Sequence, residues 1–484
     1  MRRSCRTCPS LAGRLRLEVR AGRAWAARRR RFEAGYSIAA GVGYVVDFIE
    51  RFSFSDDDLA YLATISGSDS EPLFDEGFLG YLKSMRLSVE IDAVPEGTVV
   101  FPHEPLLRVR GPILQAQLLE TPLLNMINFQ TLAATKAARI CEAAKGDDVL
   151  EFGLRRAQGF DGALAASRAA FIGGCSATSN VLAGKLFDIP VRGTHAHSWV
   201  MSFDSEIESF EAWCESMPNN AVLLVDTFDS HEGIRRAIQV GKALQERGGK
   251  FGGVRLDSGD LAWFSREARR MLDDAGLTDA AVVASNDLDE HVISSLKDQG
   301  SCVAVWGVGT RLATCADQPA LGGVYKLAAI KRQGSDEFKR TLKLSEESVK
   351  VSTPGILQLR RFSSPESGQF IADMVWDELH GPPGHDGQGL EIVDPVDPIR
   401  RRRLNDNLEF EDLLVPLIRN GCLASEQPSL RQVQERARGQ LQSLDPTVRR
   451  FLNPHRYPAG LERGLSELRT KMMIELRSNK GRHA

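Results

Sequence analysis

The stretch Gly253-Val-Arg-Leu-Asp-Ser-Gly-Asp-Leu261 decides the predicted fold of this chain. Its first four residues are typical of a short buried strand, the next four of a polar turn, and a helix is expected from Leu261. The same order recurs through the middle of the sequence. About seven such strands, alternating with helices, indicate a parallel sheet curled into an irregular α/β barrel. The other predicted strands are Val149–Phe152, Ala169–Ile172, Ile189–Val191, Val222–Val225, Val282–Ser285 and Val303–Trp306.

Polar and small residues gather where these strands end. In a β/α barrel such positions lie on one face, and the active site forms there. Ordinary loops also carry polar residues, so the chemistry of each motif has to be weighed separately. We expect the following side chains to converge at one mouth although they are far apart in sequence: Arg155, His197, Asp226, Arg255, Asp257, Asn286 and Thr310.

The regions that flank the barrel follow other patterns. Leu87 to Arg110 alternates apolar and polar residues and is broken by turns, which indicates a small antiparallel unit. Helical periodicity at Ser429–Leu441 and Leu461–Arg477 predicts two closing helices. The predicted division of the chain is an α/β sandwich at 32–145 plus 331–400, the barrel at 146–330 and a helical C-terminal region at 401–484.

The composition is that of a globular protein large enough for two or three domains. The 484 residues are 42% hydrophobic and 26% charged, and 61 Lys and Arg against 64 Asp and Glu give a net charge of −3. No stretch approaches the roughly 18 consecutive apolar residues of a membrane-spanning helix. The charge gives no general attraction to nucleic acid, and eight scattered cysteines indicate reduced thiols. We therefore expect a cytoplasmic protein without nucleic-acid or membrane partners.

Residues 1–31 have an unusual composition. They are rich in arginine, and Glu18 is their lone acidic residue. Such a segment is predicted to be a disordered, solvated tail. Its arginine content also fits an organelle transit peptide or a misassigned start of the chain, and the sequence leaves these alternatives open.

The segment Arg192-Gly-Thr-His-Ala-His-Ser-Trp199 concentrates reactive side chains. A histidine can transfer protons, accept a phosphoryl group or bind a metal. As alternate residues of a strand, His195 and His197 would share one face, and hydrogen bonds alone could satisfy both. The segment is therefore a candidate site whose meaning depends on its neighbours.

Three further motifs supply that context. Arg255 offers a planar fork suited to a carboxylate or a phosphate. Asp257 and Asp260 could hold a hydrated divalent cation or bind sugar hydroxyls, and Asp260 could instead cap the next helix. Glycine-rich turns at Gly307–Thr310 and Gly322–Lys326 follow the last barrel strands, where backbone N–H groups can reach a phosphate. Together these motifs predict a site for a phosphorylated sugar, a metal and a small anion.

From Gly35 to Leu468 the chain resembles the nicotinate phosphoribosyltransferases. The resemblance implies a type II phosphoribosyltransferase fold and an ATP-assisted reaction of nicotinate with phosphoribosyl pyrophosphate. The products would be nicotinate mononucleotide and pyrophosphate in NAD salvage, with Mg²⁺ as cofactor, ATP as co-substrate and a homodimer as the assembly. The stretches that carry the resemblance, in order, are Gly35–Gly41, Leu118–Leu124, Gly153–Gly159, Gly193–Ser198, Gly253–Leu261, Gly307–Thr310, Gly322–Lys326 and Asn453–Pro458.

The resemblance also implies roles for individual residues. ATP would phosphorylate His197, the second histidine of its motif. Thr194 and Arg255 would contact nicotinate, and Thr310 would contact phosphoribosyl pyrophosphate. His195 receives no role, and no metal ligands are assigned. The other implied substrate-binding residues are Arg155, Arg156, Asp257, Gly259, Asp260, Gly307, Gly309 and Gly323.

Two alternatives stay open. Members of this family typically begin with a Thr-Asp-Leu-Tyr-Gln-like segment whose tyrosine lies against nicotinate, whereas Tyr36 here belongs to a later motif. The chain could therefore be an impaired, nucleotide-binding paralogue. A metal-dependent hydrolase of the amidohydrolase type also uses His-x-His on a barrel. That enzyme needs further histidines at strand ends, but His231 and His291 are expected in helices or their caps.

Overall fold

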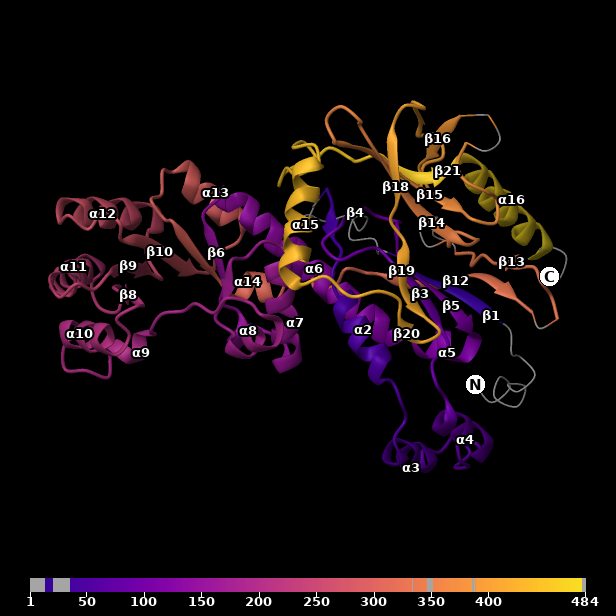
Figure 1. The fold of residues 1–484 in the computed structure, drawn as a ribbon, viewed down its shortest axis with the longest axis horizontal. Helices are drawn as coiled ribbons and strands as arrows, with labels where there is room; N and C mark the ends of the chain where they lie inside the picture. The colour runs from indigo at the N-terminus through magenta and orange to yellow at the C-terminus, as the bar shows by residue number, and fades with distance from the viewer. Residues whose placement is uncertain are drawn as a thin grey trace.

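A parallel sheet with its helices forms one end of the molecule, and two further sheets form the other end (Figure 1). The computed structural model describes residues 14–20, 35–332, 334–345, 351–384, 387 and 389–480. This arrangement confirms the predicted class of an irregular α/β barrel beside an α/β sandwich. None of the described helices is both long and apolar enough to cross a membrane.

The parallel sheet has six strands in the order β7-β6-β11-β10-β9-β8, and every neighbouring pair in it is parallel. The sheet curls into an open half barrel, with β7 at one edge and β8 at the other. A continuous apolar core that includes Trp306 and Phe251 lies between this sheet and its helices. The strands are β6 Asp148–Glu151, β7 Ala177–Thr178, β8 Ala221–Leu224, β9 Phe251–Leu256, β10 Ala281–Asn286 and β11 Val305–Val308.

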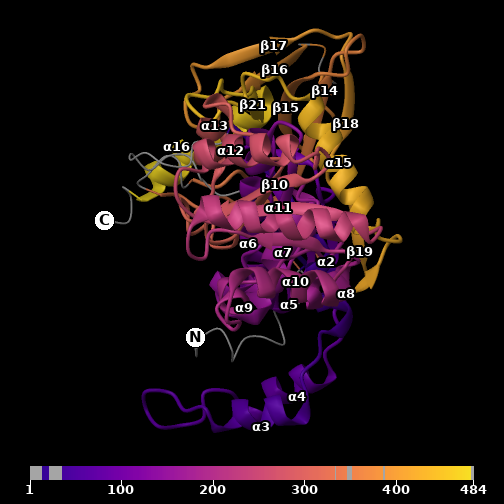
Figure 2. The same cartoon turned by 90° about the vertical axis from the view of Figure 1, so that its left-hand side faces the viewer.

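Helices follow the strands and cover the outside of this sheet (Figures 1 and 2). The polar turns after the strands also supply helix caps: Asp229, Asp260 and Asp289 accept hydrogen bonds from the first backbone N–H groups of α11, α12 and α13. The helices are α7 Gly159–Ile172, α8 Val181–Phe187, α9 His197–Val200, α10 Glu206–Ser216, α11 Ser230–Glu246, α12 Leu261–Asp274, α13 Glu290–Asp298 and α14 Thr310–Ala313.

Two predicted barrel strands are wrong. Ala169–Ile172 is the end of helix α7, because the alanine-rich run before it continues the helix, and the strand comes later as β7. Ile189–Val191 contributes one isolated parallel bridge, Val191 to Thr178, rather than a strand. The gap that this leaves between β7 and β8 is spanned by the segment that carries both histidines.

The other end of the molecule contains two larger sheets. A seven-stranded sheet has the order β13-β12-β1-β5-β3-β19-β20, and a six-stranded sheet has the order β17-β16-β21-β15-β14-β18. The first comprises β1 Arg14–Arg20, β3 Glu90–Ala93, β5 Pro105–Pro112, β12 Val324–Lys331, β13 Lys339–Arg340, β19 Val415–Arg419 and β20 Cys422–Leu423. The second comprises β14 Leu357–Ser363, β15 Phe370–Asp377, β16 Leu390–Val393, β17 Arg401–Leu404, β18 Glu409–Asp412 and β21 Ala459–Glu462.

Both chain ends depart from the prediction. Residues 14–20 form β1, paired with β5 and β12, so the expected disorder is wrong there; residues 1–13 and 21–31 lie outside the described residues. The region 401–484 contains the two predicted helices, but it also contributes five strands, β17–β21, to the two sheets. Three of these strands pair with partners far away in sequence, β18 with β14, β19 with β3 and β21 with β15, and β17 and β20 pair locally with β16 and β19.

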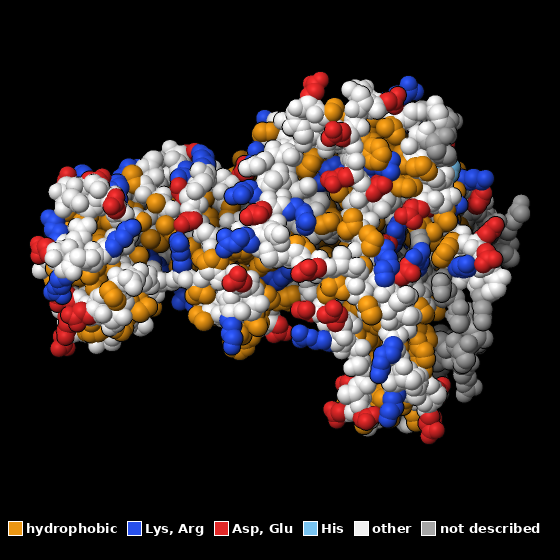
Figure 3. Space-filling view, viewed as in Figure 1, with side chains coloured by type: hydrophobic (Ala, Val, Ile, Leu, Met, Phe, Trp, Pro, Cys, Tyr) orange, Lys and Arg blue, Asp and Glu red, His pale blue; other side chains and the backbone are white. Residues whose placement is uncertain are grey.

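The remaining helices pack between and around these sheets. The long helix α6 lies between the two ends of the molecule, whereas α3 and α4 project away from the body (Figures 1 and 2). On the face in Figure 3, basic and acidic side chains are interspersed rather than separated into fields. The remaining elements are the short strands β2 Ser37–Ile38 and β4 Val99–Val100 and the helices α2 Val42–Arg51, α3 Asp56–Thr64, α4 Glu76–Ser84, α5 Ile113–Leu118, α6 Glu120–Ala144, α15 Leu430–Ser443 and α16 Arg463–Lys480.

A buried ion pair joins the two ends of the molecule. Arg168 on α7 donates two hydrogen bonds to Glu96 in the loop before β4, at 2.8 and 2.6 Å. Burial alone would raise the pKa of Glu96, but the charge and hydrogen bonds of Arg168 outweigh it and hold the pKa of this carboxyl below its ordinary value. The Gly41 N–H also donates to Glu96. This network fixes the parallel sheet, which carries the candidate site, against the sandwich.

Candidate active site

The carboxyl ends of β6, β9, β10 and β11 meet at two adjoining cavities of about 230 and 290 Å³. The cavities share Phe152, Arg155, Arg255 and Asp257. The predicted convergence of strand ends is therefore present. The first cavity is also lined by Arg156, Ser285, Asn286, Asp287, Gly307, Gly309 and Thr310, and the second by Leu154, Ser179, Gly193, Thr194, His195, Ala196, His197 and Leu224.

Arg255, near the end of β9, is held in place from three directions. Its Nε donates to Ser285 Oγ at 2.8 Å, its Nη1 to Thr194 Oγ1 at 3.1 Å, and its Nη2 to Asp257 Oδ1 at 3.1 Å. Ser285 Oγ donates in turn to Asp257. A guanidinium fixed in this way keeps its planar fork at one orientation, which suits a flat anionic group such as a carboxylate.

His197 begins helix α9 at the same mouth and is partly open to solvent. Its Nδ1 lies 3.2 Å from Thr227 Oγ1. Its Nε2 lies 3.6 Å from Asp257 Oδ2 and 4.0 Å from Asp226 Oδ1. Asp226 is buried and accepts hydrogen bonds from Asp257 N and Ser258 Oγ, both at 2.7 Å. The imidazole is therefore oriented by a hydroxyl on one side and by two carboxylates on the other.

Phe152 is a site residue that sequence reasoning missed. Its half-buried ring lines both cavities, and the Arg255 guanidinium carbon lies 5.6 Å from the ring centre. A Cβ at Gly307 would stand only 2.8 Å from this ring, so glycine is required there for the phenylalanine to lie over β11. An aromatic ring beside a guanidinium offers a face for a flat anionic heterocycle.

Two loops complete the first cavity. The short 3₁₀ helix at Leu154–Arg156 brings Arg155 and Arg156 to it, and the turn after β11 brings Gly309 and Thr310. Buried Glu151 accepts hydrogen bonds from Ser167 Oγ at 2.8 Å, from Thr178 Oγ1 at 2.6 Å and from the Gly153 N–H, which fixes the start of the arginine loop. Two arginines facing a glycine turn are suited to bind phosphate oxygens.

Sequence models of one enzyme family match nearly the whole chain. The N-terminal domain of nicotinate phosphoribosyltransferase matches residues 16–128, the nicotinate phosphoribosyltransferase (NAPRTase) family matches 148–336, and the C-terminal domain matches 358–469. The nicotinate phosphoribosyltransferase of Bacillus subtilis is 41% identical over 453 residues, which cover 93% of this chain and 90% of that protein. The chain belongs to the nicotinate phosphoribosyltransferase family.

Solved structures agree with this family membership. The crystal structure of human nicotinic acid phosphoribosyltransferase matches with a TM-score of 0.79 at 30% identity, over 96% of both chains. The human nicotinate phosphoribosyltransferase sequence is 34% identical over 499 residues, covering 91% of this chain and 90% of that protein. A nicotinate-nucleotide pyrophosphorylase from Pyrococcus furiosus shares the fold, with a TM-score of 0.65 at 23% identity. The predicted family is therefore confirmed.

Three of the predicted site residues of this family member lie outside both cavities. Asp260 caps helix α12, its Oδ1 accepting from Trp263 N at 2.9 Å. Gly259 has a φ of +76° and lies beside the Phe264 ring. Gly323 precedes β12 and lies against the Asn128 side chain. The other nine line one or both of the two cavities, and the roles implied for all twelve stay predictions.

Two other histidines bear on the hydrolase alternative. His231 on α11 lies 3.3 Å from Glu267 of α12, and His291 on α13 packs its ring against Phe451. Neither lines the cavities that contain His195 and His197. Among the described residues, His231 and His291 therefore do not add to the histidines of these cavities as an amidohydrolase site would require.

The carboxylates at the mouth fit a cation that is shared with a substrate. In the described part of the chain, no three His, Cys, Asp or Glu side chains gather closely enough to form a metal cage. However, Asp226 Oδ1 is buried without a hydrogen-bond partner, and Asp257 Oδ2 lies near the same imidazole. Mg²⁺ commonly takes one or two carboxylates together with phosphate oxygens and waters, so these residues fit a magnesium pyrophosphate complex.

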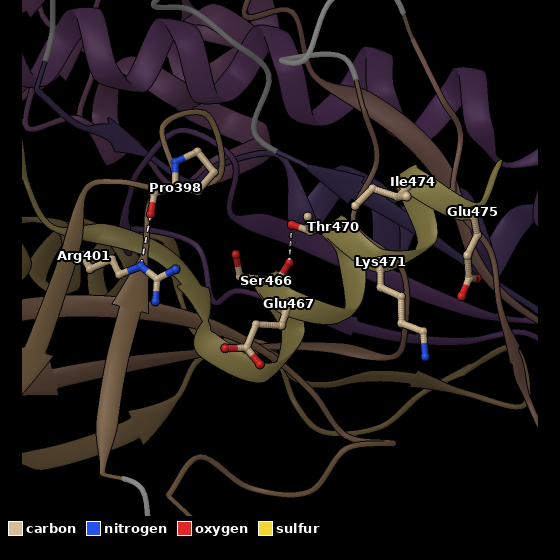
Figure 4. Close-up of a pocket in the computed structure, with 8 residues that line it drawn as sticks. All are labelled: Pro398, Arg401, Ser466, Glu467, Thr470, Lys471, Ile474 and Glu475. Atoms are coloured by element: carbon tan, nitrogen blue, oxygen red, sulfur yellow. Dashed lines mark hydrogen bonds between the residues drawn. The ribbon is translucent and has the colours of Figure 1, made fainter. Parts of the chain in front are cut away.

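A larger hollow of about 620 Å³ lies in the sandwich, away from this chemistry. It is formed between α16 and the segment around β17, and its labelled residues include Ser466, Thr470, Lys471 and Arg401 (Figure 4). The hydrogen bonds drawn there, such as Arg401 Nε to the Pro398 carbonyl, are local ones. We place the active site at the smaller cavities because arginines, carboxylates and a histidine converge there.

Buried His195 predicts that the protein loses stability as the pH falls. Burial is the main cause that lowers the pKa of His195 from 6.5 to about 4. Between these values the unfolded chain binds a proton that the folded chain does not, so stability should fall as the pH drops from 6.5 to 4. At 1.36 kcal/mol for each pH unit, this group contributes about 3 kcal/mol of that loss.

This loss is measured as the free energy of unfolding in urea at pH 6.5 and pH 4.5 for the natural protein and for His195→Gln. The glutamine variant has no proton to gain at this position. It should therefore show a smaller loss between the two pH values. An equal loss in both proteins would show that His195 does not contribute to the acid sensitivity.

Proposed function

We propose that this protein transfers the phosphoribosyl group from phosphoribosyl pyrophosphate to nicotinate, in an ATP-assisted reaction that supplies nicotinate mononucleotide for NAD salvage. The observation that carries the proposal is the fixed Arg255 guanidinium, which lies beside Phe152 and within the same mouth as His197. This arrangement places three things at one mouth: groups that can bind an aromatic carboxylate, groups that can bind phosphates, and a histidine that can accept a phosphoryl group.

Nicotinate fits the second cavity. Its carboxylate would take the Arg255 fork, next to Thr194 Oγ1, which accepts a hydrogen bond from Arg255 Nη1. Its pyridine ring would lie against Phe152, which orients the ring nitrogen toward the adjoining cavity. Nicotinamide carries no charge for the guanidinium, so the same contacts favour the acid over the amide.

Phosphoribosyl pyrophosphate fits the first cavity. Arg155 and Arg156 would bind its phosphates from one side, and the turn at Gly307, Gly309 and Thr310 from the other. In the transfer step, the nicotinate nitrogen forms a bond to C1 of the ribose while the bond from C1 to the pyrophosphate oxygen breaks. The arginines stabilise the negative charge that develops on the leaving pyrophosphate.

His197 would carry the ATP-dependent step. A ring nitrogen attacks the γ-phosphorus of ATP, the nitrogen–phosphorus bond forms, and ADP leaves with the electron pair of the bridging bond. Water later cleaves the phosphohistidine and releases phosphate. Asp226 and Asp257 face Nε2 and would stabilise the positive charge on the ring.

Mg²⁺ would be held by Asp226 and Asp257 together with phosphate oxygens of the substrates. When bound, it would neutralise charge on the pyrophosphate. The protein residues would still orient the substrates through Arg255, Thr194 and Phe152, and they would position His197.

We expect the protein to act as a cytoplasmic homodimer. Apolar side chains on α7 and α8 are exposed, with Phe160 at 83% and Val181 at 69%, and such groups suit burial against a second copy. The six described cysteines are free thiols, which fits a reducing compartment. The partners are otherwise the small molecules nicotinate, phosphoribosyl pyrophosphate and ATP.

Initial rates with two substrates test the proposal. Purified protein receives ATP, Mg²⁺, phosphoribosyl pyrophosphate and either nicotinate or nicotinamide at equal concentration, and mononucleotide is quantified by chromatography. We expect nicotinate to react on the order of 100-fold faster, because only the acid pairs with Arg255. Equal rates would contradict the assigned carboxylate contact. A folded sample that makes neither product would favour the impaired paralogue, and stoichiometric tightly bound zinc would favour the hydrolase.

A further inference from the structure

The parallel sheet has a gap between its two edge strands, and one irregular segment spans it. At the β7 edge, the Thr178 N–H donates to the Pro190 carbonyl and the Arg192 N–H donates to the Thr178 carbonyl, both at 3.0 Å. After Arg192 the segment leaves β7, and residues 193–196 form no strand. Their backbone therefore needs another anchor at the opposite edge.

A side chain provides that anchor. The Leu224 N–H at the outer edge of β8 donates to His195 Nε2 at 3.1 Å. Leu224 and His195 are both buried, so this backbone donor has the imidazole as its partner rather than water. Asn220, just before β8, adds a bond from its Nδ2 to the Gly193 carbonyl at 2.9 Å. The histidine thus takes the place that a neighbouring strand would occupy.

The surroundings of His195 fix its ring. It packs edge-on against Trp213, with ring centres 5.1 Å apart, and lies 6.2 Å from the ring of Phe210. Because Nε2 accepts the hydrogen bond from Leu224, the proton of the neutral ring is on Nδ1. The ring can therefore hold the backbone of its own residue at one distance from β8.

That backbone bears directly on the site. The His195 carbonyl accepts from Thr194 Oγ1 at 3.1 Å, and Arg255 Nη1 reaches both Thr194 Oγ1 and this carbonyl, at 3.1 and 3.5 Å. His197 follows two residues later as the first residue of α9. A shift of the His195 backbone would move the groups on both sides of it.

We propose that His195 is a positioning residue, whose bond to the open edge of β8 holds Thr194 and His197 in register with Arg255. The kinetic test of this inference rests on the proposed function, whereas the structural test rests only on the hydrogen-bond geometry. His195 borders the second cavity, but we assign it no contact with nicotinate, phosphoribosyl pyrophosphate or ATP. It acts through the segment that it anchors.

Two substitutions separate the bond from the bulk of the side chain. His195→Gln retains an acceptor at about the position of Nε2, whereas His195→Met fills similar space without one. We expect His195→Met to lower kcat/KM for nicotinate about 10- to 100-fold, through a rise in KM and slower labelling of His197. His195→Gln should keep the KM for nicotinate and the rate of His197 labelling close to those of the natural protein. The matched control is Leu272→Ala, a fully buried position of the same apolar core, which should lower Tm while leaving KM unchanged.

Hydrogen exchange gives a readout that needs no activity. In His195→Met, the amide of Leu224 and the peptide covering residues 191–196 should exchange faster than in the natural protein, and in His195→Gln they should not. Normal kinetics and normal exchange in His195→Met would overturn the proposal. A KM rise in Leu272→Ala equal to that in His195→Met would overturn it too, because any loss of stability would then have the same effect. If the natural protein makes no nicotinate mononucleotide, the function fails, and the exchange result still decides the role of His195.

Discussion

Replacing His197 with alanine is expected to abolish acid-labile labelling of the protein by ATP labelled in its γ-phosphate. Among the described residues that line the two cavities, His197 is the only histidine with a ring nitrogen within 4.0 Å of Asp226 and Asp257. The ATP-dependent rate of nicotinate mononucleotide formation should fall by about 100-fold or more, equivalent to about 2.7 kcal/mol of lost transition-state stabilisation. Labelling is followed by gel autoradiography before and after acid treatment.

The matched control for this change is His231→Ala. His231 lies on helix α11, pairs with Glu267 and is exposed to about the same degree as His197. Its removal should leave both labelling and rate unchanged. Label retained in His197→Ala would move the phosphoryl acceptor to another residue and would contradict the assigned role of the histidine motif.

Replacing Arg255 with methionine is expected to raise the KM for nicotinate about 100-fold while changing the KM for ATP little. The substitution removes the guanidinium that binds the carboxylate, and it also frees Ser285 and Asp257 from their bonds to it. Loss of a charge-assisted pair of this kind costs about 1.5–3 kcal/mol. Arg255→Lys should recover only part of the loss, since an ammonium cannot reproduce the planar fork.

Initial-rate kinetics with each substrate varied in turn check this prediction. Arg270→Met serves as the control, because Arg270 forms surface pairs with Glu267 and Asp274 on α12. Its kinetic constants should match those of the natural protein. An unchanged nicotinate KM in Arg255→Met would remove Arg255 from the substrate contact, and the preference for nicotinate over nicotinamide should disappear together with the contact if the assignment holds.

The sequence predicted the mouth of the barrel because strand ends carry their own signal. Arg155 and Thr310 follow short strands and Arg255 lies near the end of one, and parallel strands bring such positions to one edge. Phe152 was missed because a phenylalanine that ends an apolar run is typical of core. Two tertiary features distinguish it: the Arg255 guanidinium lies close to its ring, and Gly307 has no side chain that would collide with the ring.

The chain ends show a second limit of sequence reasoning. Arg14-Leu-Arg-Leu-Glu-Val-Arg20 alternates with the period of a strand, but arginine-rich composition outweighed that signal. The strands β18 and β19 pair with partners far away in sequence, which no local pattern reveals. His195 belongs to the same class, because its function depends on an edge of β8 that exists only after the sheet has formed.

A time course by phosphorus NMR of the complete reaction follows both products of the proposed phosphoribosyl transfer at once. The mixture contains the natural protein, ATP, Mg²⁺, phosphoribosyl pyrophosphate and nicotinate, and the signals of every phosphorylated species are integrated together. We predict that nicotinate mononucleotide and pyrophosphate appear in equal amounts as phosphoribosyl pyrophosphate disappears, and that omission of ATP slows their formation. Pyrophosphate released without the mononucleotide, or phosphoribosyl pyrophosphate left unchanged by folded protein, would contradict the proposed transfer to nicotinate.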